Sequence, residues 1–229
     1  MRNLVRSIVL SEPVLAEPLE DANAAYDKQD YTAALRLFRP LADQGYASAQ
    51  LNLGMMYAKG QGVPQDYVQA VKWYRLAAGQ GDVDAQLNLG MMYAKGQGVP
   101  QDYVQAVKWY RLAADRGYAS AQIMLGIMYS KGQGVPQDYV QAARWYRLAA
   151  DQGYASAQIM LGIMYSKGQG VPQDYVEAHK WFTLSAARAS ADEKDVRDLA
   201  VQERDILAKM MTPAQVAEAQ RMSREWRPK

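Results

Sequence analysis

The sequence predicts an all-α fold in which helix pairs stack one after another as a solenoid. The stretch Lys-Gly-Gln-Gly-Val-Pro-Gln-Asp-Tyr begins at Lys59 and recurs unchanged from Lys95, Lys131 and Lys167, which gives a repeat period of 36 residues. Residues 49–78 are identical to residues 85–114. Each period also holds two apolar stripes with helical spacing. A period of this length is typical of stacked helical hairpins.

Composition allows a core and excludes several classes of function. Of the 229 residues, 49% are hydrophobic, so the chain has enough apolar side chains to fold. The formal net charge of +2 is too small to indicate nucleic-acid binding. The chain has no cysteine, which excludes disulfides and thiol catalysis. No apolar run approaches the length of about 18 residues that a membrane span needs.

Residues 1–19 form an N-terminal tail or a degenerate signal-like segment. The segment starts with two basic residues, continues with an apolar stretch and ends in Val-Leu-Ala-Glu-Pro, which resembles a signal-peptidase site after Ala16. Its apolar stretch is shorter than the roughly 7–15 residues of a working signal. The pattern slightly favours export to the periplasm, with a mature chain starting near Glu17. A frayed terminus of a cytoplasmic protein is the alternative.

Residues 20–45 resemble half of a repeat. Tyr31, Ala34 and Phe38 occupy the places of Tyr67, Ala70 and Tyr74 in the later modules. The turn before them is shorter, as in a plain tetratricopeptide hairpin. We therefore expect an atypical first module, as terminal repeats usually are.

Residues 46–189 contain four full modules, each with two helices. In the first helix, Ala49, Leu53 and Tyr57 lie at i, i+4 and i+8, on one face. Gly54 lies beside this stripe, where a glycine predicts a close approach of the second helix. The second stripe comprises Tyr67, Ala70, Tyr74 and Ala77. Gly81 follows it as a stop signal.

The repeated loop has two interpretations. Two glycines beside Lys59 suggest a phosphate cradle, but a P-loop carries its lysine after the second glycine and follows a strand. Here Lys59 comes first, a helix precedes the loop, and Pro64 removes a backbone donor. We therefore predict a turn: Gly60 ends the first helix, Gly62 permits the reversal, and Asp66 caps the second helix with Gln69 as a capping-box partner.

Residues 190–229 leave the repeat and predict a C-terminal helical cap. One charged amphipathic helix should run from Asp192 to about Met210. Thr212-Pro213-Ala214-Gln215 then provides an N-cap, a proline at the first helical position and a capping-box glutamine. A second helix should run to about Trp226.

The module that reads AQLNLGMMYAKGQGVPQDYVQAVKWYRLAA resembles the Sel-one-like repeat family in its bacterial form, a relative of tetratricopeptide repeats. The resemblance covers residues 46 to about 189 and, more weakly, 20–45. It implies a right-handed superhelix of antiparallel helix pairs and an adaptor role that holds other proteins. Some cysteine-rich members have been linked to β-lactam binding. This chain has no cysteine and no Ser-x-x-Lys, so that activity is not carried over.

Candidate chemistry is sparse. His179 is the only histidine, and one histidine makes neither a metal site nor a catalytic triad. The methionines could suggest Cu(I), but they recur on helices at core-like spacing, where packing is the better explanation. The capping aspartates recur singly rather than in facing pairs. We expect no enzyme, no cofactor, no metal site and no catalytic residue.

A second face of the first helices is the candidate binding site. It lies opposite the packed stripe at 100° per residue, and tetratricopeptide-like geometry, implied by the resemblance, turns it to a concave surface. Such a strip, edged by lysines, favours a protein or peptide partner with acidic groups. The predicted groove residues are Leu51, Met55, Lys59, Leu87, Met91, Lys95, Ile123, Ile127, Lys131, Ile159, Ile163 and Lys167.

Two alternatives stay open. Tight curvature, or the C-terminal helices, could bury the strip and make it core. The function could also be that of an envelope-associated regulatory or structural module that binds polysaccharide- or peptidoglycan-linked partners. The sequence does not determine the oligomeric state.

Overall fold

The computed structural model describes residues 13–229, with side chains from Pro18 onward. This part of the chain forms twelve α-helices and a 3-10 helix, without a strand. Most of the signal-like segment, residues 1–12, lies outside the described residues. The chain divides into two compact units, one before and one after the Gln101–Asp102 bond. We describe each unit by itself.

The first unit is a series of helices in which each packs against the next. Its helices are α1 (Pro13–Asp27), α2 (Tyr31–Asp43), α3 (Ala47–Lys59), α4 (Tyr67–Gly79) and α5 (Val83–Lys95). The predicted cleavage point after Ala16 falls within α1, so export and its processing site stay predictions. Ala22 of α1, Phe38 of α2 and Leu53 of α3 are fully buried in one cluster.

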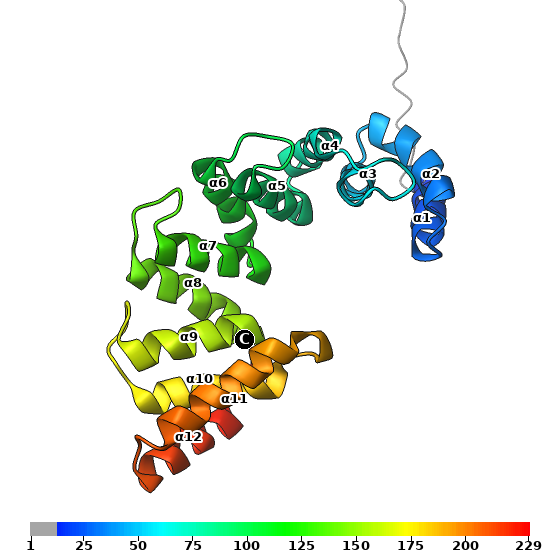
Figure 1. Ribbon diagram of the computed structural model, residues 1–229. Coiled ribbons are helices and arrows are strands. Elements are labelled where there is room, and N and C mark those ends of the chain that lie inside the picture. Colours follow the sequence, from blue (N-terminus) through cyan, green and yellow to red (C-terminus); the bar gives the residue numbers. More distant parts are fainter. Residues whose placement is uncertain (1–12) are drawn as a thin grey trace, which may run out of the picture. The chain divides into compact units, whose positions relative to one another are not determined.

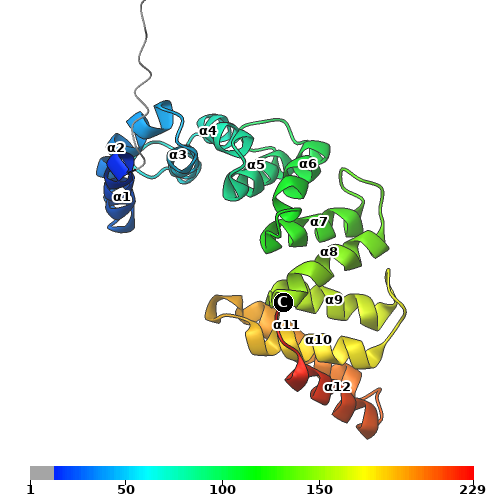
Figure 2. The same cartoon turned by 180° about the vertical axis from the view of Figure 1, so that it is seen from behind.

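The second unit continues the same construction and adds the C-terminal helices. Its helices are α6 (Tyr103–Ala114), α7 (Ala119–Lys131), α8 (Tyr139–Asp151), α9 (Ala155–Lys167), α10 (Tyr175–Arg188), the 3-10 helix η1 (Ala191–Glu193), α11 (Lys194–Ala208) and α12 (Pro213–Glu225). Helices α6 to α10 pack in succession. Both α11 and α12 pack on α10, and α11 also reaches α9 (Figures 1 and 2).

Helix ends follow the local signals. The Asp66 carboxylate accepts hydrogen bonds from the backbone amides of Val68 and Gln69, at 2.9 and 3.0 Å, which confirms the predicted N-cap of α4. The predicted capping box is not formed there, because Gln69 contributes its backbone amide and not its side chain. Gly60 ends α3 with a φ of +69°, as expected for a left-handed C-cap. Thr212 and Gln215 do form the predicted capping box of α12.

Glycine inside the first helix of a module permits close helix packing, as predicted. A Cβ at Gly54 would lie 2.5 Å from ring atoms of Tyr74 on α4. Gly126 meets Tyr146 in the same way, at 2.5 Å. The missing side chain therefore lets an aromatic ring of the second helix lie directly on the first helix.

The repeated loop has a role that the sequence did not predict. Gly62 has a φ of +70°, and a Cβ there would lie 2.5 Å from the backbone oxygen of Tyr31. Gly134 makes the equivalent contact with the backbone oxygen of Tyr103, at 2.2 Å. The second glycine of each of these loops therefore packs against the start of the second helix of the preceding module. Backbone atoms of the preceding module therefore leave no room for a side chain at the second glycine.

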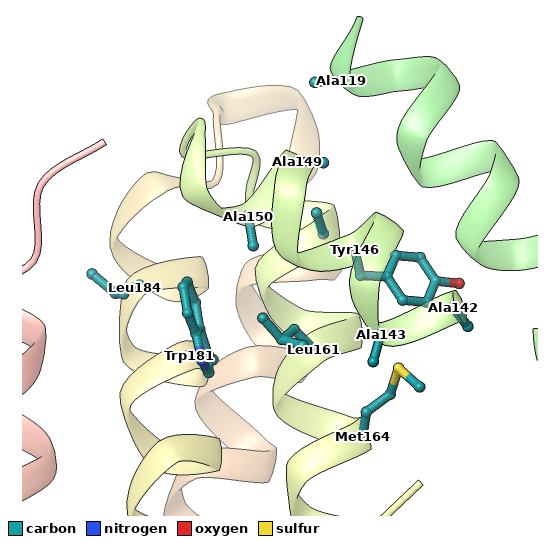
Figure 3. Packing of buried hydrophobic residues seen from close by; sticks show 11 residues of the cluster. Ala119, Ala142, Ala143, Tyr146, Ala149, Ala150, Leu161, Met164, Trp181 and Leu184 are labelled. Carbon is teal, nitrogen blue, oxygen red and sulfur yellow. The ribbon is translucent and has the colours of Figure 1, made fainter. Parts of the chain in front are cut away.

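The core of the second unit consists of alanines with a few large side chains between them. Tyr146 of α8, Leu161 and Met164 of α9 and Trp181 of α10 meet in one buried cluster (Figure 3). Alanines on α8 keep the backbones close enough for these side chains to touch. Within the described residues, no helix has the length and apolarity needed to cross a lipid bilayer.

Candidate functional site

The side chains of the predicted strip in the first unit are partly accessible to solvent. Leu51 and Met55 on α3, and Leu87 and Met91 on α5, are half-buried, and Lys59 and Lys95 at the ends of these helices are exposed. The opposite stripe is buried, with Leu53 and Leu89 at 0% exposure. The two faces of these helices therefore differ: one is core and the other is partly accessible.

The strip in the second unit is partly covered. Ile123, Ile127 and Ile163 are half-buried, while Lys131 and Lys167 are exposed. Ile159 is 4% exposed and packs in a cluster with Ala200 and Leu207 of α11. Ile159 is thus a core residue and not an accessible groove residue, because α11 lies over it.

Helix α11 also forms one wall of an apolar groove beside the covered position. The groove has a volume of about 330 Å³. Its lining residues are Ile123, Ile127, Ser156, Ile159, Met160, Asp195, Val196 and Leu199. The predicted strip supplies Ile123 and Ile127 on one wall and Ile159 in the floor.

Val196 and Leu199 were not among the predicted groove residues. Their spacing on an amphipathic helix was visible in the sequence, but it indicated only that one face of the helix is buried. That this wall lies against the repeats depends on how α11 folds back over α9 and α10.

Arginine–tyrosine pairs join neighbouring modules behind the strip. Arg75 of α4 donates a hydrogen bond to the Tyr93 hydroxyl of α5 at 2.9 Å. In the second unit, Arg111 bonds the Tyr129 hydroxyl and Arg147 bonds the Tyr165 hydroxyl. The Arg147 guanidinium also lies 5.0 Å from the centroid of the Trp181 ring. Each pair therefore joins the second helix of one module to the first helix of the next module.

Another hollow in the second unit has both polar and apolar lining. Arg111, Arg144 and Trp145 are among its lining residues, and its volume is about 520 Å³. Asp115 supplies the one carboxylate among its lining residues. In residues 13–229 no group of three or more potential metal ligands of the His, Cys, Asp or Glu type occurs.

His179 of α10 faces the C-terminal helices α11 and α12 and is 3% exposed. Arg204 and Asp205 of α11 and Gln220 of α12 lie around it. Burial lowers the pKa of His179 below its ordinary value, and the positive charge of Arg204 lowers this pKa further. The imidazole is therefore neutral at pH 7.

We expect His179→Val to weaken the dependence of stability on pH. Because the pKa is lowered in the folded state, the unfolded chain binds more protons between that lowered value and about pH 6.5, and the free energy of unfolding decreases as pH falls through this window. Valine occupies the equivalent positions 71 and 107 in buried surroundings. Urea unfolding at pH 5, 6 and 7 should give a shallower slope for the variant. Equal slopes would contradict this account.

The successive packed helix pairs define an α-solenoid repeat protein. The chain belongs to the Sel1 repeat family, whose repeat matches residues 25–46, 47–82, 83–118, 119–154 and 155–190. Members of this family are generally protein–protein interaction modules, and their scaffold is typically non-enzymatic.

Two solved structures with similar folds are described as a Sel1 repeat protein and as a protein that displays an SLR fold. A Sel1 repeat protein from Oxalobacter formigenes has a TM-score of 0.75 and 29% identity, covering 95% of this chain and 91% of its own. The protective antigen c5321 of uropathogenic Escherichia coli, which displays an SLR fold, has a TM-score of 0.57 and 34% identity over 94% of this chain. This chain spans 56% of that protein.

A third similar structure supports the fold alone. A putative Sel1 repeat protein from Klebsiella pneumoniae has a TM-score of 0.51 and 22% identity, covering 82% of this chain and 89% of its own. No curated protein matches the chain at a significant level.

Proposed function

We propose that this protein is a scaffold or adaptor that binds a peptide or protein segment on the accessible face of its first helices. The observation that carries the proposal is the repeated difference between the two sides of these helices. Leu53 and Leu89 are fully buried, whereas Leu51, Met55, Leu87 and Met91 stay half-buried at equivalent positions. An apolar strip that recurs on successive repeats suits an extended or helical segment.

The charges of the first unit indicate the chemistry of the partner. Lys59 and Lys95 are exposed at the C-terminal ends of α3 and α5, one turn beyond Met55 and Met91. A partner with apolar side chains along one edge and carboxylates along the other would complement this surface.

In this proposal the chain keeps four segments: the tail 1–19, an atypical first module 20–45, four repeats 46–189 and the cap 190–229.

We expect Met55→Glu combined with Met91→Glu to abolish partner binding while the fold is retained. The two carboxylates would repel an acidic partner and would remove the apolar strip of the first unit. The matched control is Val68→Glu with Leu76→Glu, because these side chains are 62% and 45% exposed on α4. Immobilised full-length chain would capture the partner from a lysate of the source cells, and titration calorimetry with the purified partner would compare the three proteins.

The control pair should bind like the wild type, and the strip pair should bind at least about tenfold more weakly. Circular dichroism would check that both variants fold. A strip variant that unfolds, or that binds the partner with the affinity of the wild type, would contradict the proposal.

A second candidate function is an envelope-associated module for polysaccharide- or peptidoglycan-linked partners. The similarity to an Escherichia coli protective antigen favours it. Capture of peptidoglycan or polysaccharide fragments, in place of a protein, would support this candidate over the first.

A further inference from the structure

We propose that the second unit carries a docking site for an extended segment of a partner protein, with an aromatic side chain flanked by carboxylates. The site is the hollow of about 520 Å³ described above, which we call the α8 hollow. The proposal goes beyond the predicted strip, because no residue of the strip lines this hollow. The lining residues that carry the argument are Asp115, Gly117, Gln141, Arg144, Trp145 and Leu148.

The last module contains the counterpart of this hollow, one repeat period further along the chain. Asp151, Gly153 and Trp181 there occupy the positions of Asp115, Gly117 and Trp145. The segment that follows α12, residues 226–229, lies on this counterpart. Its first residue, Trp226, has extended backbone angles (φ −64°, ψ 140°). The chain itself therefore shows what kind of segment such a surface accepts.

The contacts of this segment involve both its backbone and its side chains. The Trp226 ring centroid lies 6.3 Å from that of Trp181, edge to face, and a Cβ at Gly153 would lie 3.8 Å from the Trp226 ring. The Lys229 amide donates a hydrogen bond of 2.8 Å to the Asp151 carbonyl. The Lys229 ammonium lies 3.2 Å from the Asp151 carboxylate. An aromatic residue and a base three positions later thus fit this surface.

The equivalent surface is open at the α8 hollow. Trp181 and Leu184 are 1% and 6% exposed, because Trp226 and side chains of α12 cover them. At the equivalent positions on α8, Leu148 is 43% exposed and Trp145 is half-buried. The hollow therefore offers apolar surface that an aromatic side chain of a partner would bury.

Hydrogen-bond donors at the hollow indicate a carboxylate as the second feature of the segment. In α10 the Glu177 carboxylate accepts hydrogen bonds from the Trp181 indole at 2.9 Å and from the Lys180 ammonium at 2.7 Å. In α8 the residue equivalent to Glu177 is Gln141, and the buried Nε1 of Trp145 has no hydrogen-bond partner. A buried donor without a partner costs free energy, which a carboxylate of the docked segment would recover.

The charges agree with this assignment. Arg144 takes the place of Lys180, is exposed, and has no ion-pair partner among residues 13–229. The charged lining residues of the hollow are Arg111, Arg144 and Asp115. The equivalent positions of the last module hold two cations and two carboxylates: Arg147, Lys180, Asp151 and Glu177. The hollow thus has one carboxylate fewer, and a carboxylate of the partner restores the balance.

The position of this carboxylate follows from the helix geometry. Residues four apart are neighbours on a helix, so a carboxylate beside the aromatic residue reaches the Trp145 indole once the Gln141 amide turns aside. Asp115 then remains for a base, as Asp151 pairs with Lys229. The complementary segment therefore has carboxylates beside its aromatic residue and a base further on.

A second copy of this chain is a poorer occupant than such a partner. Arg188 lies 4.5 Å from the centroid of the Trp226 ring, whereas its equivalent beside the hollow is the neutral Gln152. The residue after Trp226 is the basic Arg227, and the hollow already has an excess of positive charge. Carboxylates in the partner replace both features, because they meet Arg144 and the indole of Trp145.

The first test follows the indole N–H signal of Trp145 by nitrogen–proton NMR in the full-length chain, with Trp145→Phe to assign it. The probe is the blocked peptide Ac-Glu-Trp-Glu-Pro-Lys-NH2, which is segment 225–229 with glutamate in place of Arg227. It should shift the Trp145 signal saturably and leave that of Trp181 in place. Replacing both glutamates by glutamine, or the tryptophan by alanine, should weaken binding at least about tenfold. No saturable shift, or equal binding of the three peptides, would overturn the proposal.

A matched pair of variants separates the carboxylate site from a general effect of charge. Gln141→Glu places on α8 the carboxylate that Glu177 supplies on α10. It should bind the glutamate peptide at least about tenfold more weakly, and the glutamine peptide as tightly as the wild type does. Val140→Glu adds the same charge at a neighbouring position that is 61% exposed. It should change either affinity less than about twofold. A Gln141→Glu chain that binds the glutamate peptide like the wild type would refute the site.

Two further comparisons distinguish this site from the strip and from self-association. The variant Met55→Glu with Met91→Glu should bind the glutamate peptide with wild-type affinity, so failure of the strip and failure of the hollow give different results. Loss of peptide binding in that variant would place the peptide on the strip and would contradict the proposal. Tighter binding of the unmodified segment 225–229 than of the glutamate peptide would identify a second copy as the occupant, and would likewise contradict it.

Discussion

Gly134→Ala is expected to destabilise the second unit far more than Gly117→Ala does. Both glycines have a positive φ, of +70° and +86° respectively, so an alanine is strained at either position. The left-handed conformation costs an alanine about 1–2 kcal/mol, which is the whole expected effect at Gly117, where a Cβ meets no atom within 4 Å. At Gly134 the Cβ would lie 2.2 Å from the backbone oxygen of Tyr103.

The extra loss at Gly134 measures the contact between modules. A backbone carbonyl at the start of α6 cannot move aside as a flexible side chain can, so the loop itself must shift. Overpacking of this kind costs about 1–3 kcal/mol of stability, in addition to the strain of an alanine in the left-handed backbone conformation. Urea unfolding followed by circular dichroism gives the two free energies of unfolding. Equal losses for the two variants would show that the loop tolerates displacement and would contradict the proposed role of the second glycine.

Trp181→Ala is expected to lower the free energy of unfolding by about 3–5 kcal/mol, as for other buried aromatic side chains. Trp181 is 1% exposed in the cluster that joins α8, α9 and α10 (Figure 3). Its Nε1 donates a hydrogen bond to Glu177 at 2.9 Å, and its ring lies 6.3 Å from the Trp226 ring, beyond the end of α12. The loss would be a large part of the stability of a typical domain, about 5–15 kcal/mol.

The variant should also loosen the C-terminal helix, because Trp226 loses the ring against which it packs. Hydrogen exchange should therefore accelerate in α12 more than in α6. Leu148→Ala is the matched control: Leu148 is 43% exposed, and its truncation should change stability by about 0.5 kcal/mol or less. A Trp181 variant as stable as the control would show that the cluster repacks and would refute this account.

The sequence alone determined the elements and the ends of the repeated helices. The 36-residue period shows where each module begins and ends. Within a module, the aspartate at the start of the second helix and the glycine after the first helix act on only a few neighbouring residues. Asp66 and Gly60 therefore behave as predicted, because capping depends on local backbone geometry. The difference between the buried and accessible sides of α3 and α5 was likewise contained in the helical spacing.

Only the tertiary structure decided what covers each face. Ile123 and Ile159 occupy the same position in identical helices, yet Ile123 is half-buried while Ile159 is 4% exposed. No local signal distinguishes them, because the difference comes from α11, which follows later in the chain and packs on α9 and α10 of the last module. The contact of Gly134 with the Tyr103 carbonyl is equally non-local. A helical period specifies which residues share a side of a helix, but the neighbour on that side is set by long-range packing of whole helices.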